Sequence, residues 1–476
     1  MKHVHILGIG GVFMGSLALI ARQLGYKVTG IDANLYPPMS DILKDNNIFY
    51  IEANSNFESF DDDQKVLLKQ ADYVIVGNVI TRKNPAIDYL LDNDIKFYSG
   101  ANWLYEFVLR KQWVVAVTGT HGKTTTTSLL TWILDYAGLE PGFLLGGSHG
   151  NFGVSSRLGA GNFFVIEADE YDTSLFDKRP KFLHYFPDTL IINNIEFDHA
   201  DIYNSVDEIK KQFGYLLRTV SSTYGKVVFN ADDGNLLDVL KENDNLEKVG
   251  FSISADNNQK ELDTFKKLNN IYKAKINANR EFILKALKDY KIDSPLMGEH
   301  NISNVIAAIT AAEHAGVPME VAIESLKTFK GVARRLEFKG EIGHIKIYDD
   351  FAHHPTAISK TLDAIKKEYP NSKIIAVVDF CSYSMRNGVH KELIADSLKL
   401  ADQAILYKGE YVNWSLEDYI VSKNKNQLIN ICNDIDSLHS QIQDINNSNS
   451  VIVFMSNGKF TKVIPEVLIN LKSKSS

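Results

Sequence analysis

Nine residues, Thr118 to Thr126, constrain the fold of this chain more than any other segment. They read TGTHGKTTT, at the end of an apolar run and the start of a helix-like stretch. A glycine turn between a strand and a helix points backbone N–H groups at phosphate oxygens. The usual G-x-x-x-x-G-K-[ST] spacing of such a loop places a glycine five residues before Gly122, where this sequence has Val117. The segment therefore predicts a shortened phosphate-binding loop in an α/β unit, with a chance turn as the alternative.

The rest of the chain alternates short apolar runs with helix-like stretches, which is typical of α/β proteins with parallel sheets. Its 476 residues exceed the span of one hydrophobic core. We therefore predict three domains: a Rossmann-like N-terminal domain over 1–109, a central P-loop ATPase-like domain over 110–329, and a C-terminal Rossmann-like α/β domain over 330–476.

Composition excludes several classes of protein. The net charge is −8 without a basic block, which argues against nucleic-acid binding. No apolar run approaches the roughly 20 residues of a membrane helix. The first residues lack the pattern of a signal peptide, so we expect a cytoplasmic protein. The chain has two cysteines, which are too few for a disulfide framework. The sequence leaves open whether the protein is a monomer or a weak homo-oligomer.

The phosphate-binding loop carries the most specific assignments. Lys123 would neutralise the terminal phosphates of a nucleotide, and the hydroxyl of Thr124 would contact Mg²⁺. The remaining residues that we expect to bind ATP in this loop are Gly119, Thr120, His121, Gly122 and Thr125.

A second glycine turn, Gly8-Ile9-Gly10-Gly11, follows the first strand-like run, and Asp32 ends the next. This resembles a dinucleotide fingerprint, but Phe13 stands where the third glycine belongs. We therefore predict a site for the diphosphate of some other nucleotide. A purely structural turn is the alternative.

Two acidic loops follow buried strand-like runs in the central region. One contains Glu167 to Asp172, and the other contains Asn193 to Asp201 with His199. Carboxylates at strand ends can reach a phosphate-bound metal, so the two loops together predict a site for two magnesium ions beside Thr124. A solvated acidic loop and a surface histidine are the alternatives.

Three later segments are also rich in polar groups. They are Gly298 to Asn304, the pair Arg334 and Arg335, and Asp349 to Thr356. Each segment has an alternative to nucleotide contacts: a helix cap for the first, solvated linker charges for the arginine pair, and a capped turn for the last.

Taken in order, these segments resemble the Mur ligases, the ATP-dependent amide ligases of peptidoglycan assembly. The resemblance implies that the first domain binds a UDP-sugar, the central domain ATP and Mg²⁺, and the third domain an incoming peptide. The residues that it assigns to catalysis are Lys123, Glu167, His199, Arg335 and His353. Thr124, Glu167 and His199 would hold metal, Asn304, Arg335 and Asp350 would bind ATP, and Gly8, Gly10, Gly11, Asp32 and Asn78 would bind the UDP-sugar.

Within the family, the chain looks most like the branch that accepts UDP-N-acetylmuramate. Several segments resemble members that attach the murein tripeptide L-alanyl-γ-D-glutamyl-meso-diaminopimelate more than members that attach L-alanine: Phe13 to Gly15, Asp32 to Ser40, Glu170 to Thr173, Phe176 to Arg179 and Met455 to Gly458. Phe380 to Arg386 departs from the expected pattern. Some family members hold a second metal with a carbamylated lysine, and Lys210 and Lys211 lie in that region.

The implied reaction activates the lactyl carboxylate as an acyl phosphate, which the tripeptide amine then attacks. We expect hinge motion near Arg110 and Lys330, because the acyl phosphate must be kept from water. The rival interpretations are an L-alanine ligase, a nicotinamide-dependent oxidoreductase suggested only by Gly8 to Gly11, and a nucleotide-regulated binding protein without turnover.

Overall fold

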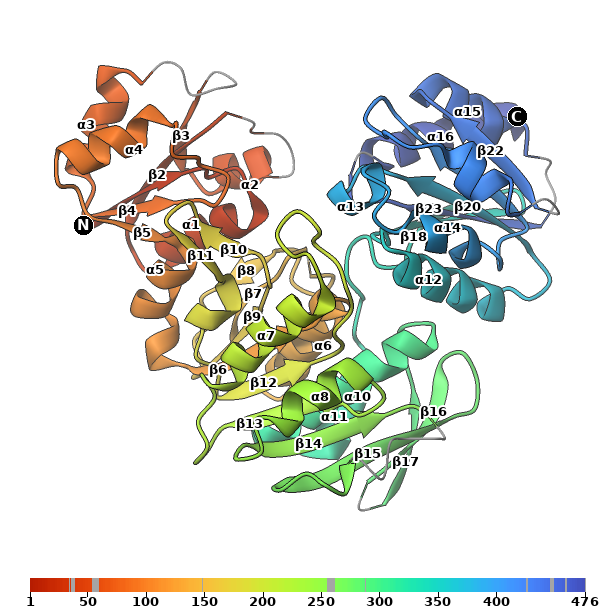
Figure 1. Cartoon of the computed structure of the whole chain (residues 1–476), viewed down its shortest axis with the longest axis horizontal. Helices are drawn as coiled ribbons and strands as arrows, with labels where there is room; N and C mark the ends of the chain where they lie inside the picture. Colours follow the sequence, from red (N-terminus) through yellow and green to blue (C-terminus); the bar gives the residue numbers. More distant parts are fainter. Residues whose placement is uncertain are drawn as a thin grey trace.

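Three helix-covered sheets follow one another along the chain (Figure 1). The computed structural model describes residues 1–33, 35, 39–53, 60–147, 149–254, 262–286, 288–424, 427–445, 449–458 and 460–475. Part of the predicted Asp32 to Ser40 motif, residues 34 and 36–38, lies outside this description. The predicted α/β class is confirmed. Within the described residues, none of the helices combines the length and apolar character needed to span a bilayer.

The N-terminal sheet is parallel, with the strand order β3-β2-β1-β4-β5. Its strands are β1 (His3–Leu7), β2 (Lys27–Asp32), β3 (Phe49–Glu52), β4 (Tyr73–Val76) and β5 (Phe97–Ser99), and its helices are α1 (Val12–Gln23), α2 (Met39–Asp45), α3 (Asp62–Gln70), α4 (Pro85–Asp92) and α5 (Gly100–Phe107). The order reverses between β1 and β4, where ligands bind in open α/β sheets. The predicted glycine turn follows β1, and Asn78 follows β4.

The central sheet has the order β17-β16-β15-β14-β13-β12-β6-β9-β7-β8, and β6 and β12 are parallel neighbours near its middle. Its strands are β6 (Trp113–Thr118), β7 (Gly142–Leu144), β8 (Ser156–Arg157), β9 (Phe163–Glu167), β12 (Thr189–Ile192), β13 (Lys226–Asn230), β14 (Glu247–Ser252), β15 (Leu268–Ile276), β16 (Glu281–Lys285) and β17 (Asp289–Asp293). The helices are α6 (Lys123–Tyr136), α7 (Val206–Leu217), α8 (Gly234–Lys241), α10 (Glu299–His314) and α11 (Met319–Leu326). A separate hairpin, β10 (Asp172–Ser174) and β11 (Asp177–Pro180), leads into the short 3₁₀ helix η2 (Lys181–His184).

The C-terminal sheet has the order β18-β19-β23-β20-β21-β22, and only β18 is antiparallel to its neighbour in this described sheet. Its strands are β18 (Glu337–Ile342), β19 (Ile345–Asp350), β20 (Lys373–Asp379), β21 (Gln403–Tyr407), β22 (Leu428–Cys432) and β23 (Ser450–Met455). Its helices are α12 (Pro355–Glu368), α13 (Tyr383–Arg386), α14 (Lys391–Ser397), α15 (Ile435–Gln443) and α16 (Phe460–Ser475). Buried side chains on both faces of the inner strands explain their continuous apolar runs.

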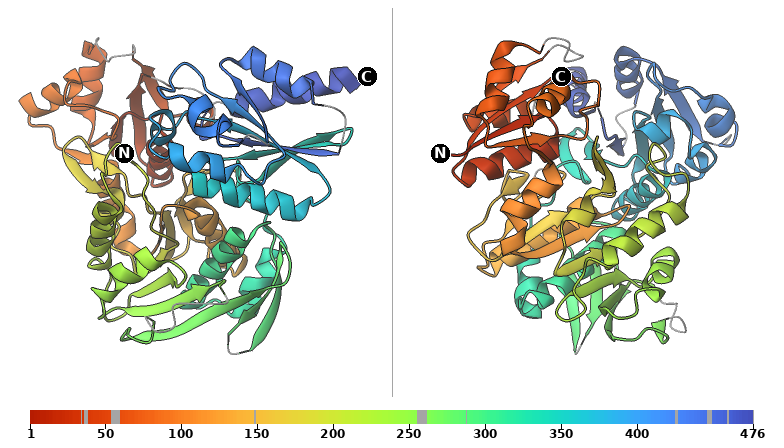
Figure 2. Two further views of the ribbon diagram at one scale, coloured as in Figure 1. Left: turned by 45° about the vertical axis from the view of Figure 1, so that its right-hand side comes forward. Right: turned by 60° about the vertical axis from the view of Figure 1, so that its left-hand side comes forward.

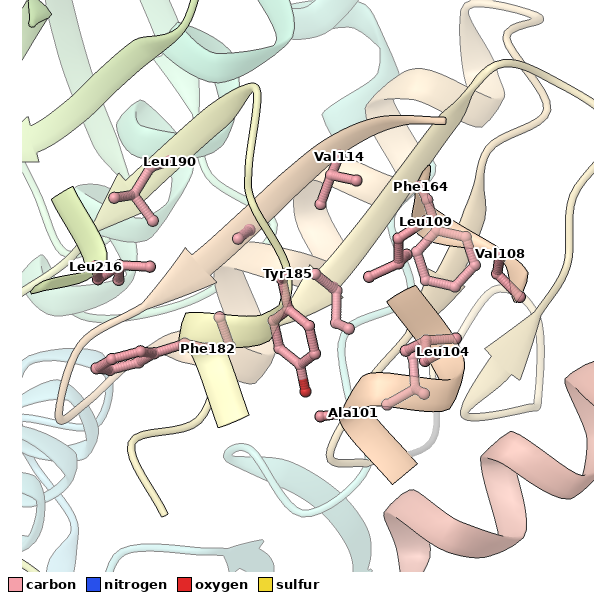
Figure 3. Close-up of a cluster of buried hydrophobic side chains, with 14 of the residues drawn as sticks. Ala101, Leu104, Val108, Leu109, Val114, Phe164, Phe182, Tyr185, Leu190 and Leu216 are labelled. Atoms are coloured by element: carbon pink, nitrogen blue, oxygen red, sulfur yellow. The ribbon is translucent and has the colours of Figure 1, made fainter. Parts of the chain in front are cut away.

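The N-terminal and central units share one hydrophobic core. Figure 3 shows Leu104 and Leu109, from α5 and the turn after it, beside Phe164 of β9 and Tyr185 of the segment after η2. The hydroxyls of Ser16 and Ser155 are also hydrogen-bonded across this boundary, at 2.8 Å. Relative motion of these two units would expose apolar surface, so the shared core argues against a hinge near Arg110.

The contact between the central and C-terminal units is more polar. Helix α12 lies against α10 in Figure 2, and Arg280 forms an ion pair with Glu368 at 3.0 Å across this boundary. Lys367 of α12 also pairs with Glu299, at 2.7 Å. The Lys367–Glu299 pair is the more exposed of the two, and exposed ion pairs are worth little energy, whereas the Arg280–Glu368 pair is partly buried.

Candidate active site

The predicted phosphate-binding loop lies between the end of β6 and the start of α6. Gly119 and Gly122 have φ values of +126° and +82°. A Cβ atom at Gly122 would lie 2.4 Å from Oδ1 of Asn304, so no larger residue fits there. The loop is held by Asn194, whose Oδ1 accepts a 2.8 Å hydrogen bond from the amide of His121. Helix α6 starts beyond Gly122 without a side-chain cap, which leaves its N-terminal N–H groups to a ligand such as phosphate.

Lys123 is buried beside two carboxylates. Its Nζ donates to the carbonyl of Gly119 at 2.8 Å and to Oε2 of Glu170 at 2.8 Å, and it lies 3.9 Å from Oδ1 of Asp169. Burial alone would lower the pKa of Lys123, but the charges of Glu170 and Asp169 raise it overall. The lysine is therefore a fixed positive charge at the mouth of the loop.

Thr124 connects the loop to the C-terminal unit. Its hydroxyl donates to Oε1 of Glu167 at 3.0 Å and accepts a 3.2 Å hydrogen bond from Nη2 of Arg335. Burial raises the pKa of Glu167, against the opposing effects of the Gly146 amide and Lys123. A cation bound here would favour the charged carboxylate, which fits the expected metal role of Thr124 and Glu167.

Glu170 is the second centre of the site, and it binds His199 as well as Lys123. Nε2 of His199 lies 2.9 Å from Oε1 of Glu170. Burial would lower the pKa of His199, but Glu170 raises it above its ordinary value. Burial would likewise raise the pKa of Glu170, but Lys123 and His199 hold it far below its usual range. Ligand atoms of Asp169, Glu170 and His199 lie within 4.8 Å of one another, close enough to share a metal ion.

The expected metal ligands therefore fall into two neighbouring groups. Glu167 lies with Thr124 and Arg335, whereas His199 lies with Glu170 and Lys123. Neither lysine considered for carbamylation makes a contact in these groups: Lys210 pairs with Asp238 at 2.9 Å, and Lys211 is exposed.

Asn304 and Asp350 make structural contacts. Oδ1 of Asn304 accepts a 3.1 Å hydrogen bond from the hydroxyl of Thr126 beneath the loop. The carboxylate of Asp350 accepts from the amides of Leu336 and Ala352, at 2.8 and 2.9 Å, and from a threonine hydroxyl. The bond to Leu336 fixes the backbone directly after Arg335, so Asp350 shapes the site from within the C-terminal unit.

Burial lowers the pKa values of two neighbouring histidines, His353 and His354. Burial lowers the pKa of His353 to about 4, although Asp198 opposes the shift. His354 lies with His121 and Glu196, whose ligand atoms are within 4.8 Å of one another. The predicted Phe380 to Arg386 segment reaches this region through Ser384, whose hydroxyl donates to Asp198 at 3.2 Å.

A pocket of about 330 Å³ lies at the reversal point of the N-terminal sheet. All five residues expected to bind the UDP-sugar line it: Gly8, Gly10, Gly11, Asp32 and Asn78. Oδ2 of Asp32 accepts a 2.7 Å hydrogen bond from the amide of Gly10, which fixes the turn. Thr173 and Lys181, from the central unit, line the same pocket. Thr173 ends the Glu170 to Thr173 segment noted in the sequence, whereas no sequence pattern pointed to Lys181.

Family comparisons cover almost the whole chain. Residues 3–112 match the Mur ligase family catalytic domain, residues 117–312 the Mur ligase middle domain, and residues 334–458 the Mur ligase glutamate ligase domain. The UDP-N-acetylmuramate–L-alanyl-γ-D-glutamyl-meso-2,6-diaminoheptandioate ligase of Haemophilus influenzae is 41% identical over 100% of both chains.

The chain belongs to the Mur ligase family.

Other Mur ligases agree with this assignment. The Escherichia coli ligase of the same name is 42% identical over 99% of both chains. A murein peptide ligase crystal structure from Psychrobacter arcticus has a TM-score of 0.72 and 36% identity, covering 99% of both chains. A UDP-N-acetylmuramate–L-alanine ligase of Clostridium botulinum is 32% identical over 84% of this chain and 83% of its own.

Proposed function

We propose that this Mur ligase joins the lactyl carboxylate of UDP-N-acetylmuramate to the amine of L-alanyl-γ-D-glutamyl-meso-diaminopimelate, at the expense of ATP. The product returns a recovered cell-wall peptide to the nucleotide-linked precursor pool, so the role is in peptidoglycan recycling. The observation that carries the proposal is the full-length identity of 41–42% to two relatives named for this reaction. The matched L-alanine ligase is less similar and covers less of the chain.

The arrangement of the three units supports the same division of substrates. The pocket at the N-terminal sheet would hold the UDP-sugar, and the loop Gly119 to Thr125 would hold ATP. Family matches at 3–112, 117–312 and 334–458 support the domains 1–109, 110–329 and 330–476. The third domain would then bind the tripeptide. We place the protein in the cytoplasm, as a monomer or weak homo-oligomer, because its substrates are cytoplasmic precursors.

The residues present fit Mg²⁺. Hydroxyl and carboxylate oxygens are its preferred ligands, and Thr124 with Glu167 supplies one such set. Asp169 and Glu170 supply further carboxylate oxygens, with an imidazole nitrogen of His199 beside them. Bound there, Mg²⁺ would neutralise phosphate charge as the γ-phosphoryl group is transferred.

The chain's own residues would promote two steps. In the first, a lactyl carboxylate oxygen attacks the γ-phosphorus, the bond to the β-phosphate oxygen breaks, and ADP leaves. Lys123 and the N-terminus of α6 would stabilise the charge on the transferring group. In the second, the peptide amine attacks the acyl carbon, the carbon–oxygen bond breaks, phosphate leaves, and the amine nitrogen loses a proton to water. Arg335 would bring positive charge from the C-terminal unit to Thr124 when the units close.

The decisive experiment measures phosphate release from ATP with Mg²⁺ and UDP-N-acetylmuramate. One sample contains L-alanine and the other contains the tripeptide. Release that requires the tripeptide supports the proposal, whereas release with L-alanine alone would assign the chain to the biosynthetic branch. Mass spectrometry of the product should show the tripeptide joined to the UDP-sugar with loss of one water.

A further inference from the structure

The pocket at the N-terminal glycine turn is closed on one side by a residue of the central unit. Lys181 is the single basic side chain among the described residues that line this pocket. Its side chain is 13% exposed, and its Nζ lies 5.4 Å from the ring centroid of Phe13. Phe13 is the second residue of α1, so the ammonium group lies over the N-terminal turn of that helix.

Packing fixes this position. The amide of Lys181 donates to the carbonyl of Tyr171 at 2.9 Å, directly beyond the β10–β11 hairpin. The tip of the hairpin is anchored on the N-terminal unit, because the rings of Phe176 and Phe97 meet edge to face at 5.1 Å. Leu175 packs against the apolar cluster around Leu7. The lysine is therefore held across the boundary between two units that share a core.

Nothing in the described part of the chain accepts a hydrogen bond from Nζ of Lys181. A neighbouring carboxylate oxygen, Oδ2 of Asp169, is 3.8 Å away, which is beyond hydrogen-bond distance. The other oxygen of Asp169 lies 3.9 Å from Lys123. The ammonium group of Lys181 thus keeps its donors for a ligand, while Asp169 reduces the cost of holding the charge in a half-buried place.

The opposite wall of the pocket also favours an anion. Gly11 caps α1 without a side-chain hydrogen bond, and the first turn of α1 contains no acidic residue. The first N–H groups of a helix and its dipole attract phosphate. A cation on one side and a helix N-terminus on the other suit a ligand with two adjacent negative charges.

We propose that Lys181 binds the diphosphate of the UDP-sugar from the central unit, opposite the N-terminus of α1. This inference rests on the proposed function, because it assumes that a UDP-sugar occupies the pocket. The lysine would then select for diphosphate-linked substrates and fix the sugar relative to the ATP loop.

Binding of three probes to the Lys181→Met variant tests this assignment. The probes are UDP-N-acetylmuramate, UDP, which lacks the sugar, and uridine, which lacks both phosphates. A charge-assisted hydrogen bond is worth roughly 1.5–3 kcal/mol, so we expect about 10- to 100-fold weaker binding of both diphosphate ligands. Binding of uridine and of ATP should change less than about twofold.

Two further variants make the result specific. Lys181→Arg keeps the charge and should retain most of the affinity for UDP. Lys178→Met removes an exposed lysine of the same hairpin, with a side chain that is 70% exposed, and should bind all three probes as the unaltered protein does. The inference is wrong if Lys181→Met binds UDP with normal affinity, or if its affinity for uridine falls by the same factor as its affinity for UDP. If the unaltered protein binds none of the probes, the proposed substrate is wrong as well.

Discussion

Lys123 and Glu170 form a buried ion pair, with Nζ 2.8 Å from Oε2, and His199 binds the other oxygen of the same carboxylate. One carboxylate therefore holds the loop lysine and the histidine of the second loop together. In the proposed reaction, the terminal phosphates of ATP compete with Glu170 for Lys123, so nucleotide binding would require this pair to rearrange. The free energy of the pair thus influences both folding and nucleotide affinity.

Replacement of Lys123 by methionine should abolish most of the activity. The side chain retains its length but loses the charge that would oppose the phosphates, and a lost electrostatic contact of this kind costs about 10²–10³ in rate. Phosphate release with saturating substrates measures the effect. Lys178→Met is the control, and near-normal turnover by Lys123→Met would remove the loop from the mechanism.

Replacement of Glu170 by glutamine should destabilise the protein. It leaves Lys123 buried beside a neutral group, and removal of one partner of a buried pair costs about 3–5 kcal/mol. Denaturant unfolding measures the loss. The double variant Lys123→Met/Glu170→Gln should recover part of it, because no unpaired charge remains at the pair. Strict additivity of the two single changes would show that the pair carries no coupling energy.

The stability of the protein should fall on acidification, in part because of His149. Its Nδ1 accepts a hydrogen bond from the amide of Asn151, so Nε2 carries the proton and donates to the carbonyl of Ser128. Burial lowers the pKa of His149 from 6.5 to about 4. The unfolded chain therefore takes up the proton first, and this contribution to stability is complete above pH 6.5 and decreases towards pH 4.

The size of this effect is at most about 3 kcal/mol, since each pKa unit corresponds to about 1.4 kcal/mol. His149→Gln keeps a donor for Ser128 but does not titrate. Melting temperatures of both proteins between pH 7 and pH 5 should differ in slope, with the shallower dependence in the variant. Parallel slopes would show that His149 takes up no proton on unfolding in this range.

Replacement of Thr356 by valine should loosen the contact between the central and C-terminal units. The hydroxyl of Thr356 donates to Glu196 at 2.7 Å across this boundary, and valine has nearly the same shape without the donor. We expect a larger radius of gyration in solution scattering without ligands, and a smaller difference once ATP and UDP-N-acetylmuramate are bound. Thr223→Val, at an exposed turn, should leave the scattering curve unchanged.

Local patterns predicted those parts of the site that one unit builds alone. The glycine loop before α6 could be predicted because Gly119 and Gly122 must adopt positive φ values. The turn at Gly8 and the position of Asn78 could be placed together because both follow strands that flank the reversal of the sheet. In each case, the carboxyl ends of neighbouring parallel strands lie at one edge of the sheet. The order of the strands in the sequence is then enough to place the residues that follow them.

Parts of the site that depend on docking between units could not be predicted in this way. Lys181 lines the pocket proposed for the UDP-sugar because the tip of the hairpin packs on the N-terminal unit, where Phe176 contacts Phe97, which is 79 residues away in sequence. Glu170 gave a partial signal as the third acidic residue of the EADE run, but its ion pair with Lys123 depends on the spacing of β6 and β9. The hinge predicted near Arg110 ignored the core that the first two units share.

That shared core has a consequence for how peptide specificity can change. The N-terminal and central units share a hydrophobic core, which would set the separation between the proposed UDP-sugar pocket and the proposed ATP loop before any peptide arrives. A C-terminal unit exchanged at about Lys330 would then have to match the polar contacts of this boundary, the apolar contact around Met297 and the position of Arg335 beside Thr124. Chimeras built at that junction offer a direct route to ligases that accept other amine donors.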